Sequence, residues 1–89
     1  MAPGEEPRVH FWRTAVGAEV DFLVEDGTEL IPIEVKLSAT PRPRMAAGIE
    51  RLRHDLGERV RPGYVVHLGA VELPLGRHAT ALPFARLWQ

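Results

Sequence analysis

Residues 19–37, E-V-D-F-L-V-E-D-G-T-E-L-I-P-I-E-V-K-L, decide the fold of this chain because they contain two alternating runs joined by a turn signal. Alternation with a period of two is typical of β-strands, whose successive side chains point to opposite faces. The dipeptide Asp26-Gly27 is a strong hairpin signal, since glycine readily adopts the positive φ that a type I′ turn requires. We therefore expect an antiparallel hairpin with strands over residues 19–25 and 28–37.

Alternation divides the side chains of this hairpin between two faces. Apolar residues make up one face, which holds Val20, Phe22, Val24, Ile31, Ile33, Val35 and Leu37. The opposite face holds Glu19, Asp21, Leu23, Glu25, Leu30, Pro32, Glu34 and Lys36. Because proline has no N–H to donate to a strand ladder, Pro32 is expected at an edge, a bulge or a break in the second strand.

The predicted two-residue turn also sets the register of the hairpin. It places Glu19 opposite Glu34. Asp21 then lies opposite Pro32, and Lys36 follows on the same face. Like charges opposite one another destabilise a sheet, and a divalent cation with oxygen ligands would compensate them. The alternative is a solvated face whose charges form an ordinary cross-strand ion network.

The rest of the chain completes a small α/β fold. Strand composition predicts short strands over residues 9–14 and 64–68. Residues 71–75 and 80–82 are expected to form a second, weaker hairpin. An apolar stripe at helical spacing, Met45, Ile49, Leu52 and Leu56, predicts a helix that ends at Gly57. The order predicts a mixed α+β architecture: a three-stranded antiparallel meander, a crossover helix, a fourth strand and a short β or irregular tail. Residues 1–8 are expected to form a disordered leader, residues 15–18 a turn, and residues 9–89 a single domain.

Composition excludes several classes of protein. The 89 residues, 45% of them hydrophobic, suit one small domain. The chain has no cysteine, and its four histidines lie far apart in sequence, so metal chemistry here would use oxygen ligands. A net charge of -1 does not support coating of nucleic acid through bulk charge. No apolar run is long enough to span a membrane, and no export signal is evident, so the expected compartment is the cytoplasm.

Two motifs in this chain resemble a known superfamily. The segments G-A-E-V-D-F, residues 17–22, and P-I-E-V-K, residues 32–36, resemble the D…(D/E)-x-K signature of the PD-(D/E)XK nucleases. The wider stretch from Phe11 to Arg44 is similar to the nuclease-like C-terminal domain of unknown function found on many prokaryotic AAA+-type ATPases. The resemblance covers about residues 10–88. It implies a nuclease-like core that forms the C-terminal part of a longer ATPase.

The resemblance also implies roles for individual residues. Asp21 and Glu34 would bind a divalent ion, Mg²⁺ or Mn²⁺, with the backbone carbonyl of Val35 completing the ligand set. Lys36, the only lysine among eleven basic residues, would position the attacking water or help to deprotonate it. Glu19 adds a further carboxylate to this expected metal site. The implied activity is hydrolysis of nucleic acid phosphodiesters.

Three arginines are candidates for contacts with a nucleic acid backbone. Arg13 ends the first expected strand, and Arg42 and Arg44 lie in the loop after Lys36. Phosphate contacts of this kind position a nucleic acid without reading its sequence. The alternative is that they are ordinary surface arginines.

The chain also departs from the superfamily pattern. The nuclease core normally begins with a helix, which is either missing here or lies in a longer native protein. No G-x-x-x-x-G-K-[ST] motif is found in these 89 residues. An absent helix would leave one sheet face uncovered, which favours a homodimer. The alternative function is therefore a catalytically inactive accessory module that serves docking, dimerisation or nucleic-acid binding.

Overall fold

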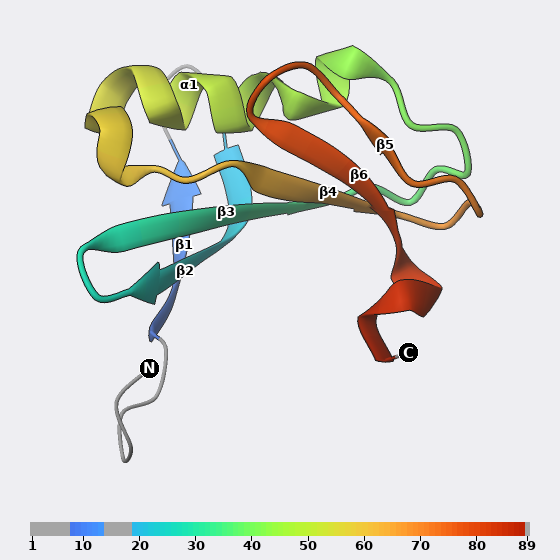
Figure 1. Ribbon diagram of the computed structural model, residues 1–89, viewed down its shortest axis with the longest axis horizontal. Helices are drawn as coiled ribbons and strands as arrows, with labels where there is room; N and C mark the ends of the chain where they lie inside the picture. Colours follow the sequence, from blue (N-terminus) through green and yellow to red (C-terminus); the bar gives the residue numbers. More distant parts are fainter. Residues whose placement is uncertain (1–7, 14–18, 89) are drawn as a thin grey trace.

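The computed structural model describes residues 8–13 and 19–88, without the side chains of residues 11–13, 19 and 88. Six strands form one mixed sheet in the order β1-β2-β3-β4-β6-β5 (Figure 1). The strands are β1 (Arg8–Arg13), β2 (Glu19–Asp26), β3 (Glu29–Val35), β4 (Gly63–His67), β5 (Leu73–Pro74) and β6 (Ala79–Pro83). The helical elements are α1 (Ala47–Leu56) and three short 3₁₀ turns, η1 (Pro43–Ala46), η2 (Gly57–Arg59) and η3 (Phe84–Trp88).

This architecture confirms the mixed α+β prediction. Strands β1, β2 and β3 form an antiparallel meander, and α1 connects β3 to its parallel neighbour β4. Strand β6 continues the sheet parallel to β4, and the short β5 pairs with it as the expected weak hairpin. Residues 1–7 of the predicted leader and the predicted turn at residues 15–18 lie outside the described residues. In the part of the chain that is described, no helix is long and apolar enough to cross a membrane.

The turn between β2 and β3 differs from the predicted one. Asp26 pairs with Glu29, so the two central residues are Gly27 and Thr28 instead of Asp26 and Gly27. Gly27 has a φ of 64°, and no described non-glycine residue has a positive φ. A hairpin turn with positive φ at its first central position alone is of type II′, which accepts glycine there and threonine next.

The changed turn moves the register by two residues. Leu23, and not Asp21, lies opposite Pro32. The predicted Glu19–Glu34 and Asp21–Pro32 pairs are therefore wrong. A slip of two residues keeps every side chain on its own face, so the division of β3 between two faces is preserved. Continuing the observed register places Asp21 beside Glu34.

Strand β2 breaks the predicted alternation. Val20 and Leu23 are both buried in the core, although they are an odd number of residues apart. The reason is an irregularity in the pairing of β1 with β2, whose register shifts between His10 and Trp12. Phe22, between these two core residues, is 39% exposed.

Pro32 lies in the interior of the sheet and is fully buried, so of the expected edge, bulge or break the edge is excluded, and the pairing of β3 with β4 is interrupted at this residue. Its missing N–H is accommodated by local separation of β3 and β4. Their parallel ladder begins at Ile33, and a single isolated bridge joins Leu30 to Val60 before it. The space beside the proline ring is occupied by the backbone of Gly63.

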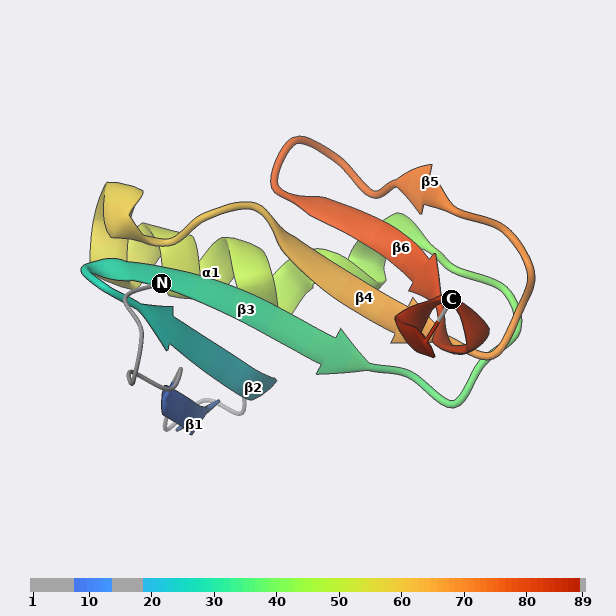
Figure 2. The ribbon, with the colours of Figure 1, turned by 60° about the horizontal axis from the view of Figure 1, so that its bottom comes forward.

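Helix α1 covers one face of the sheet and leaves the other open. Ile49 and Leu52 of α1 are fully buried against the core, and Gly57 ends the helix with a φ of 77°. In β3 the side chains of Leu30, Pro32 and Glu34 are buried, whereas those of Ile31, Ile33 and Val35 are half-buried or exposed. Figure 1 shows α1 on one side of the sheet and η3 on the other, and Figure 2 shows the same sheet from a second direction.

Candidate functional site

The ends of β2 and β3 are joined by side chains where the backbone ladder stops. The last backbone pair of the ladder is Phe22 with Ile33. Beyond it, the backbone N–H of Asp21 donates to Oε1 of Glu34 over 3.1 Å. In return, the backbone N–H of Val35 donates to Oδ2 of Asp21 over 2.7 Å. These reciprocal bonds fix two carboxylates next to each other on adjacent strands.

Lys36 extends this pair to a cluster of three charged groups. Its Nζ lies 3.3 Å from Oε2 of Glu34. Its backbone N–H donates to the carbonyl of Val66 over 2.9 Å, which holds the residue at the boundary between β3 and β4. The Lys36 side chain is 40% exposed, but that of Glu34 is only 4% exposed. A solvent-accessible ammonium therefore covers a buried carboxylate.

Burial makes the Glu34 carboxylate unusual. Loss of solvent raises its pKa above the ordinary value, and the charge of Asp21 acts in the same direction. The nearby Lys36 ammonium, which lowers the pKa, does not fully offset this effect. The side chain of Glu34 is only 4% exposed, so this carboxylate is not on a solvated face, but its contact with Lys36 is an ion pair of the kind that the alternative expected. Carboxylates with perturbed pKa values occur at functional sites, and ion-pair networks also produce them.

The raised pKa of Glu34 predicts a specific pH dependence of stability. A carboxyl with a higher pKa in the folded state is stabilising while protonated, and this contribution is lost as pH rises through the folded pKa. The free energy of unfolding of the metal-free wild type should therefore fall from mildly acidic to neutral pH, relative to Glu34→Gln. We expect the variant to gain stability relative to wild type across this range, because it lacks the carboxyl group that has to ionise in a buried position.

Urea unfolding at several pH values measures this difference. Glu58→Gln is the matched control, because it removes an exposed carboxylate on η2. The control should follow the wild-type pH profile. If Glu34→Gln also follows it, the Glu34 carboxylate does not carry the burial cost that its position implies.

The oxygen donors at this site suit a divalent ion that keeps several of its water ligands. Asp21 and Glu34 provide two adjacent carboxylates, and Val35 follows Glu34 with its backbone carbonyl. No group of three or more acidic, histidine or cysteine side chains that could together hold a metal ion occurs among the described residues. Mg²⁺ usually keeps several waters and is held by only one or two carboxylates, so this donor set fits it. Oε2 of Glu34 now contacts Lys36, and an ion binding there would compete with the ammonium.

The structure does not place every predicted site residue. Glu19 pairs through its backbone with Arg13 of β1, but both side chains lie outside the described part of the chain. Their roles therefore stay predictions. Arg42 and Arg44 are exposed at the start of η1, beyond the loop that follows β3 (Figure 1). No contact between described residues joins either arginine to the carboxylates or to Lys36.

His67 lies near the cluster, but both of its ring nitrogens interact with backbone groups outside it. It is fully buried at the end of β4 and lines a hollow with Lys36. Its Nδ1 accepts the backbone N–H of Gly69 over 3.0 Å, and its Nε2 lies 2.8 Å from the carbonyl of Val71. Both ring nitrogens are engaged, so His67 holds the loop after β4 in place and is not positioned to bind a metal.

Sequence reasoning did not predict the apolar hollow next to Lys36. The hollow that contains Lys36 and His67 measures about 230 Å³, and its remaining lining is apolar: Val35, Leu37, Val66, Leu68 and Phe84. Alternation in β3 indicated two faces but did not indicate which one α1 covers. The exposed positions of Leu37 and Phe84 follow from that choice and from the path of the chain after β6.

Comparison with known proteins gives one match. Residues 2–87 match the model of a family described as a domain of unknown function, DUF4143. No curated protein and no solved structure matches the chain. The family match includes all six strands, α1 and the cluster of Asp21, Glu34 and Lys36. The chain therefore belongs to the DUF4143 family.

Proposed function

We propose that this domain is a divalent-metal-dependent nuclease of the PD-(D/E)XK kind, which hydrolyses phosphodiester bonds in nucleic acid. One observation carries the proposal. Asp21 and Glu34 are locked together by reciprocal hydrogen bonds at the ends of adjacent strands, with the Lys36 ammonium 3.3 Å from Glu34. These are the residues that the D…(D/E)-x-K resemblance assigns to catalysis.

The proposed metal ligands are the carboxylates of Asp21 and Glu34, with the backbone carbonyl of Val35 and with Glu19 as a further candidate. When bound, Mg²⁺ or Mn²⁺ would neutralise charge on the phosphate and lower the pKa of a bound water. The protein contributes rigidity. Backbone N–H groups hold one oxygen of each carboxylate, so neither side chain has to reorganise when a substrate arrives.

Lys36 is the group best placed to meet a phosphate. Its side chain is 40% exposed, so a phosphate entering from solvent can reach the ammonium. There it would stabilise the negative charge that develops as the water oxygen bonds to phosphorus and the bond from phosphorus to the leaving oxygen breaks. The proton lost by the water ends on the leaving oxygen. Arg13, Arg42 and Arg44 are proposed as weaker contacts to the phosphate backbone.

The proposal extends to the cellular context. By resemblance, the domain would follow an AAA+-type ATPase module in the same native chain and would act in the cytoplasm. With an ATPase and a nuclease-like domain in one chain, the ATPase would move or remodel the nucleic acid that the nuclease-like domain hydrolyses.

A cleavage assay tests the proposal. Labelled single-stranded DNA, double-stranded DNA and RNA are incubated with purified protein and Mg²⁺ or Mn²⁺, and products are resolved on denaturing gels. We expect cleavage that chelation abolishes, and a rate at least about 100-fold lower in Asp21→Asn and Lys36→Met. Arg51→Met is the control, because Arg51 pairs with Asp55 on the exposed side of α1. Cleavage that survives unchanged in both Asp21→Asn and Lys36→Met would contradict the proposal.

One observation favours a second candidate, a catalytically inactive accessory module. The sheet face opposite α1 carries exposed aromatic and aliphatic side chains, as a docking or dimerisation surface would. If no nucleic acid is cleaved with either ion, this second function becomes the better one.

A further inference from the structure

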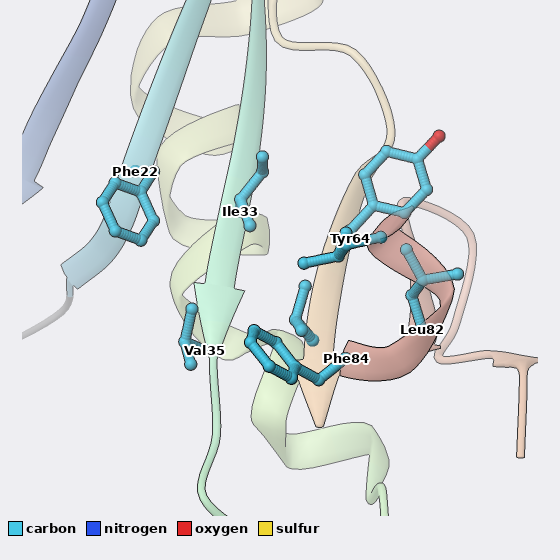
Figure 3. Close-up of a pocket in the computed structure, with 8 residues that line it drawn as sticks. Phe22, Ile33, Val35, Tyr64, Leu82 and Phe84 are labelled. Carbon is cyan, nitrogen blue, oxygen red and sulfur yellow. The ribbon is translucent and has the colours of Figure 1, made fainter. Parts of the chain in front are cut away.

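The sheet face opposite α1 contains an apolar groove. Its lining comes from four strands and η3, and includes Phe22, Val35, Tyr64, Leu82, Phe84 and Leu87 (Figure 3). We call these residues the open-face groove. It measures about 410 Å³, and every residue that lines it is apolar or aromatic. It adjoins the hollow beside Lys36, with which it shares Val35, Val66 and Phe84.

The strands beneath this groove are of a kind that is normally covered. Strand β4 runs parallel to both of its neighbours, β3 and β6. All-parallel sheets occur almost only with both faces covered, whereas over the parallel β3-β4-β6 part of this mixed sheet the described residues place a helix, α1, on one face alone. On the open face Phe22 is 39% exposed, Tyr64 41% and Leu87 53%. A surface of this composition indicates a partner.

The groove lies directly beside η3. Strands β3 and β4 contribute its floor, and Phe84 and Leu87 of η3 line one side of it; Figure 3 shows Phe84 next to Val35. We call η3 the ridge of this face. Under a two-fold axis, each copy presents a ridge to the groove of the other, as an isologous interface requires. Lys36 is the one charged residue among the described linings of the groove and the adjoining hollow, so two copies would not face strong like-charge repulsion.

The extent of the surface also suits a second copy. Leu37, 86% exposed, and Leu68, 58% exposed, adjoin the groove. Together with them, the exposed apolar surface of this face amounts to roughly 600–800 Å², if each aromatic side chain has an area of about 150–250 Å². Stable interfaces bury about 800 Å² per partner. The patch is thus large for a monomer but sufficient for one side of a dimer.

We propose that this chain forms a two-fold symmetric homodimer through the open-face groove, with η3 of each copy packed into the groove of the other. This inference does not rest on the proposed nuclease activity, because Glu34 lies buried on the α1 side of β3. The groove does adjoin the hollow that contains Lys36, so the dimer would cover surface next to the proposed site.

Sedimentation velocity of the 89-residue chain over a range of concentrations tests the proposal. We expect a species of twice the 9.9 kDa monomer mass. Leu87→Lys and Tyr64→Lys should each weaken the dimer at least tenfold. Leu56→Lys is the matched control, because Leu56 is a 39% exposed leucine on α1 outside the groove, and it should leave the dimer unchanged.

A second measurement keeps the proposal open to refutation if a lysine variant fails to fold. The chain contains no cysteine, so Leu87→Cys places one spin label on the ridge. Dipolar coupling between two labels is expected in the dimer, and it should disappear on dilution with excess unlabelled protein. A wild type that stays monomeric at every concentration would overturn the proposal, as would a dimer that Leu87→Lys leaves intact.

Discussion

Saturating Mn²⁺ should raise the melting temperature of this domain by roughly 10–20 °C. An ion at a hundred times its dissociation constant adds about 2.7 kcal/mol to folding stability if it binds only the folded state. Each kcal/mol moves the midpoint of a domain of this size by roughly 4–8 °C. The folded state alone brings Asp21 and Glu34 together, because their contact depends on the pairing of β2 with β3. Mg²⁺ should act in the same direction, with Mn²⁺ the tighter ligand at comparable concentrations.

Thermal unfolding followed by circular dichroism measures this shift. Asp21→Asn and Glu34→Gln should lose the response to both ions, because each removes one of the two carboxylates. Asp55→Asn is the matched control, since Asp55 is an exposed carboxylate on α1 that pairs with Arg51. Sodium chloride at equal ionic strength controls for screening. If neither ion changes the melting curve, the metal site and the nuclease proposal fail together, and the accessory function replaces them.

Substitution of Gly63 by alanine should destabilise the fold by about 3 kcal/mol, at the upper end of the range for overpacked cores. Gly63 is buried at the start of β4, and its N–H donates to the carbonyl of His78 over 2.8 Å. A Cβ there would lie 2.6 Å from Cγ of Pro32 and would collide with the carbonyl oxygen of the same residue. Neither a backbone oxygen nor a proline ring can move aside without shifting β3.

The expected fall in melting temperature is roughly 12–24 °C. Gly57→Ala provides the comparison, because a Cβ at Gly57 meets open space and the cost comes only from the φ of 77°. With a ψ of −153°, this residue lies in a region that is almost restricted to glycine, so the cost is about 1–3 kcal/mol and should not exceed that of the clash at Gly63. A Gly63→Ala variant as stable as wild type would show that β3 and β4 do not approach each other as closely as described.

The β2–β3 hairpin shows which structural features a sequence pattern predicts and which it does not. The two faces of β3 could be predicted because backbone geometry sets a period of two, whatever the neighbouring elements are. The turn could not, because Gly27 accepts positive φ as either the first or the second central residue. Placing it first moves the register by two residues and puts Asp21 beside Glu34. The clustering of these residues with Lys36 was expected, but from an incorrect pairing.

The burial of Glu34 could not be predicted from the sequence pattern. Both faces of β3 contain apolar side chains, so alternation alone does not show which of them a helix will cover. Helix α1 packs on the face of Leu30 and Pro32, which buries Glu34 with them. The same choice leaves the isoleucines of β3 and Tyr64 of β4 on the open face. The position of a helix depends on the packing of the whole core, which no local motif records.

The central claim, that Asp21 and Glu34 share one divalent ion beside Lys36, is tested most directly by adding small amounts of Mn²⁺ to ¹⁵N-labelled protein and recording the amide spectrum. This paramagnetic ion broadens the signals of nearby amides. The amide signals of Asp21, Val35 and Lys36 should disappear first. The signal of Gly27, in the turn before β3 and roughly 20 Å away by strand geometry, should persist. The substitution Asp21→Asn should remove the broadening. Broadening centred on the Gly27 turn or on α1, or unchanged in Asp21→Asn, would contradict the claim.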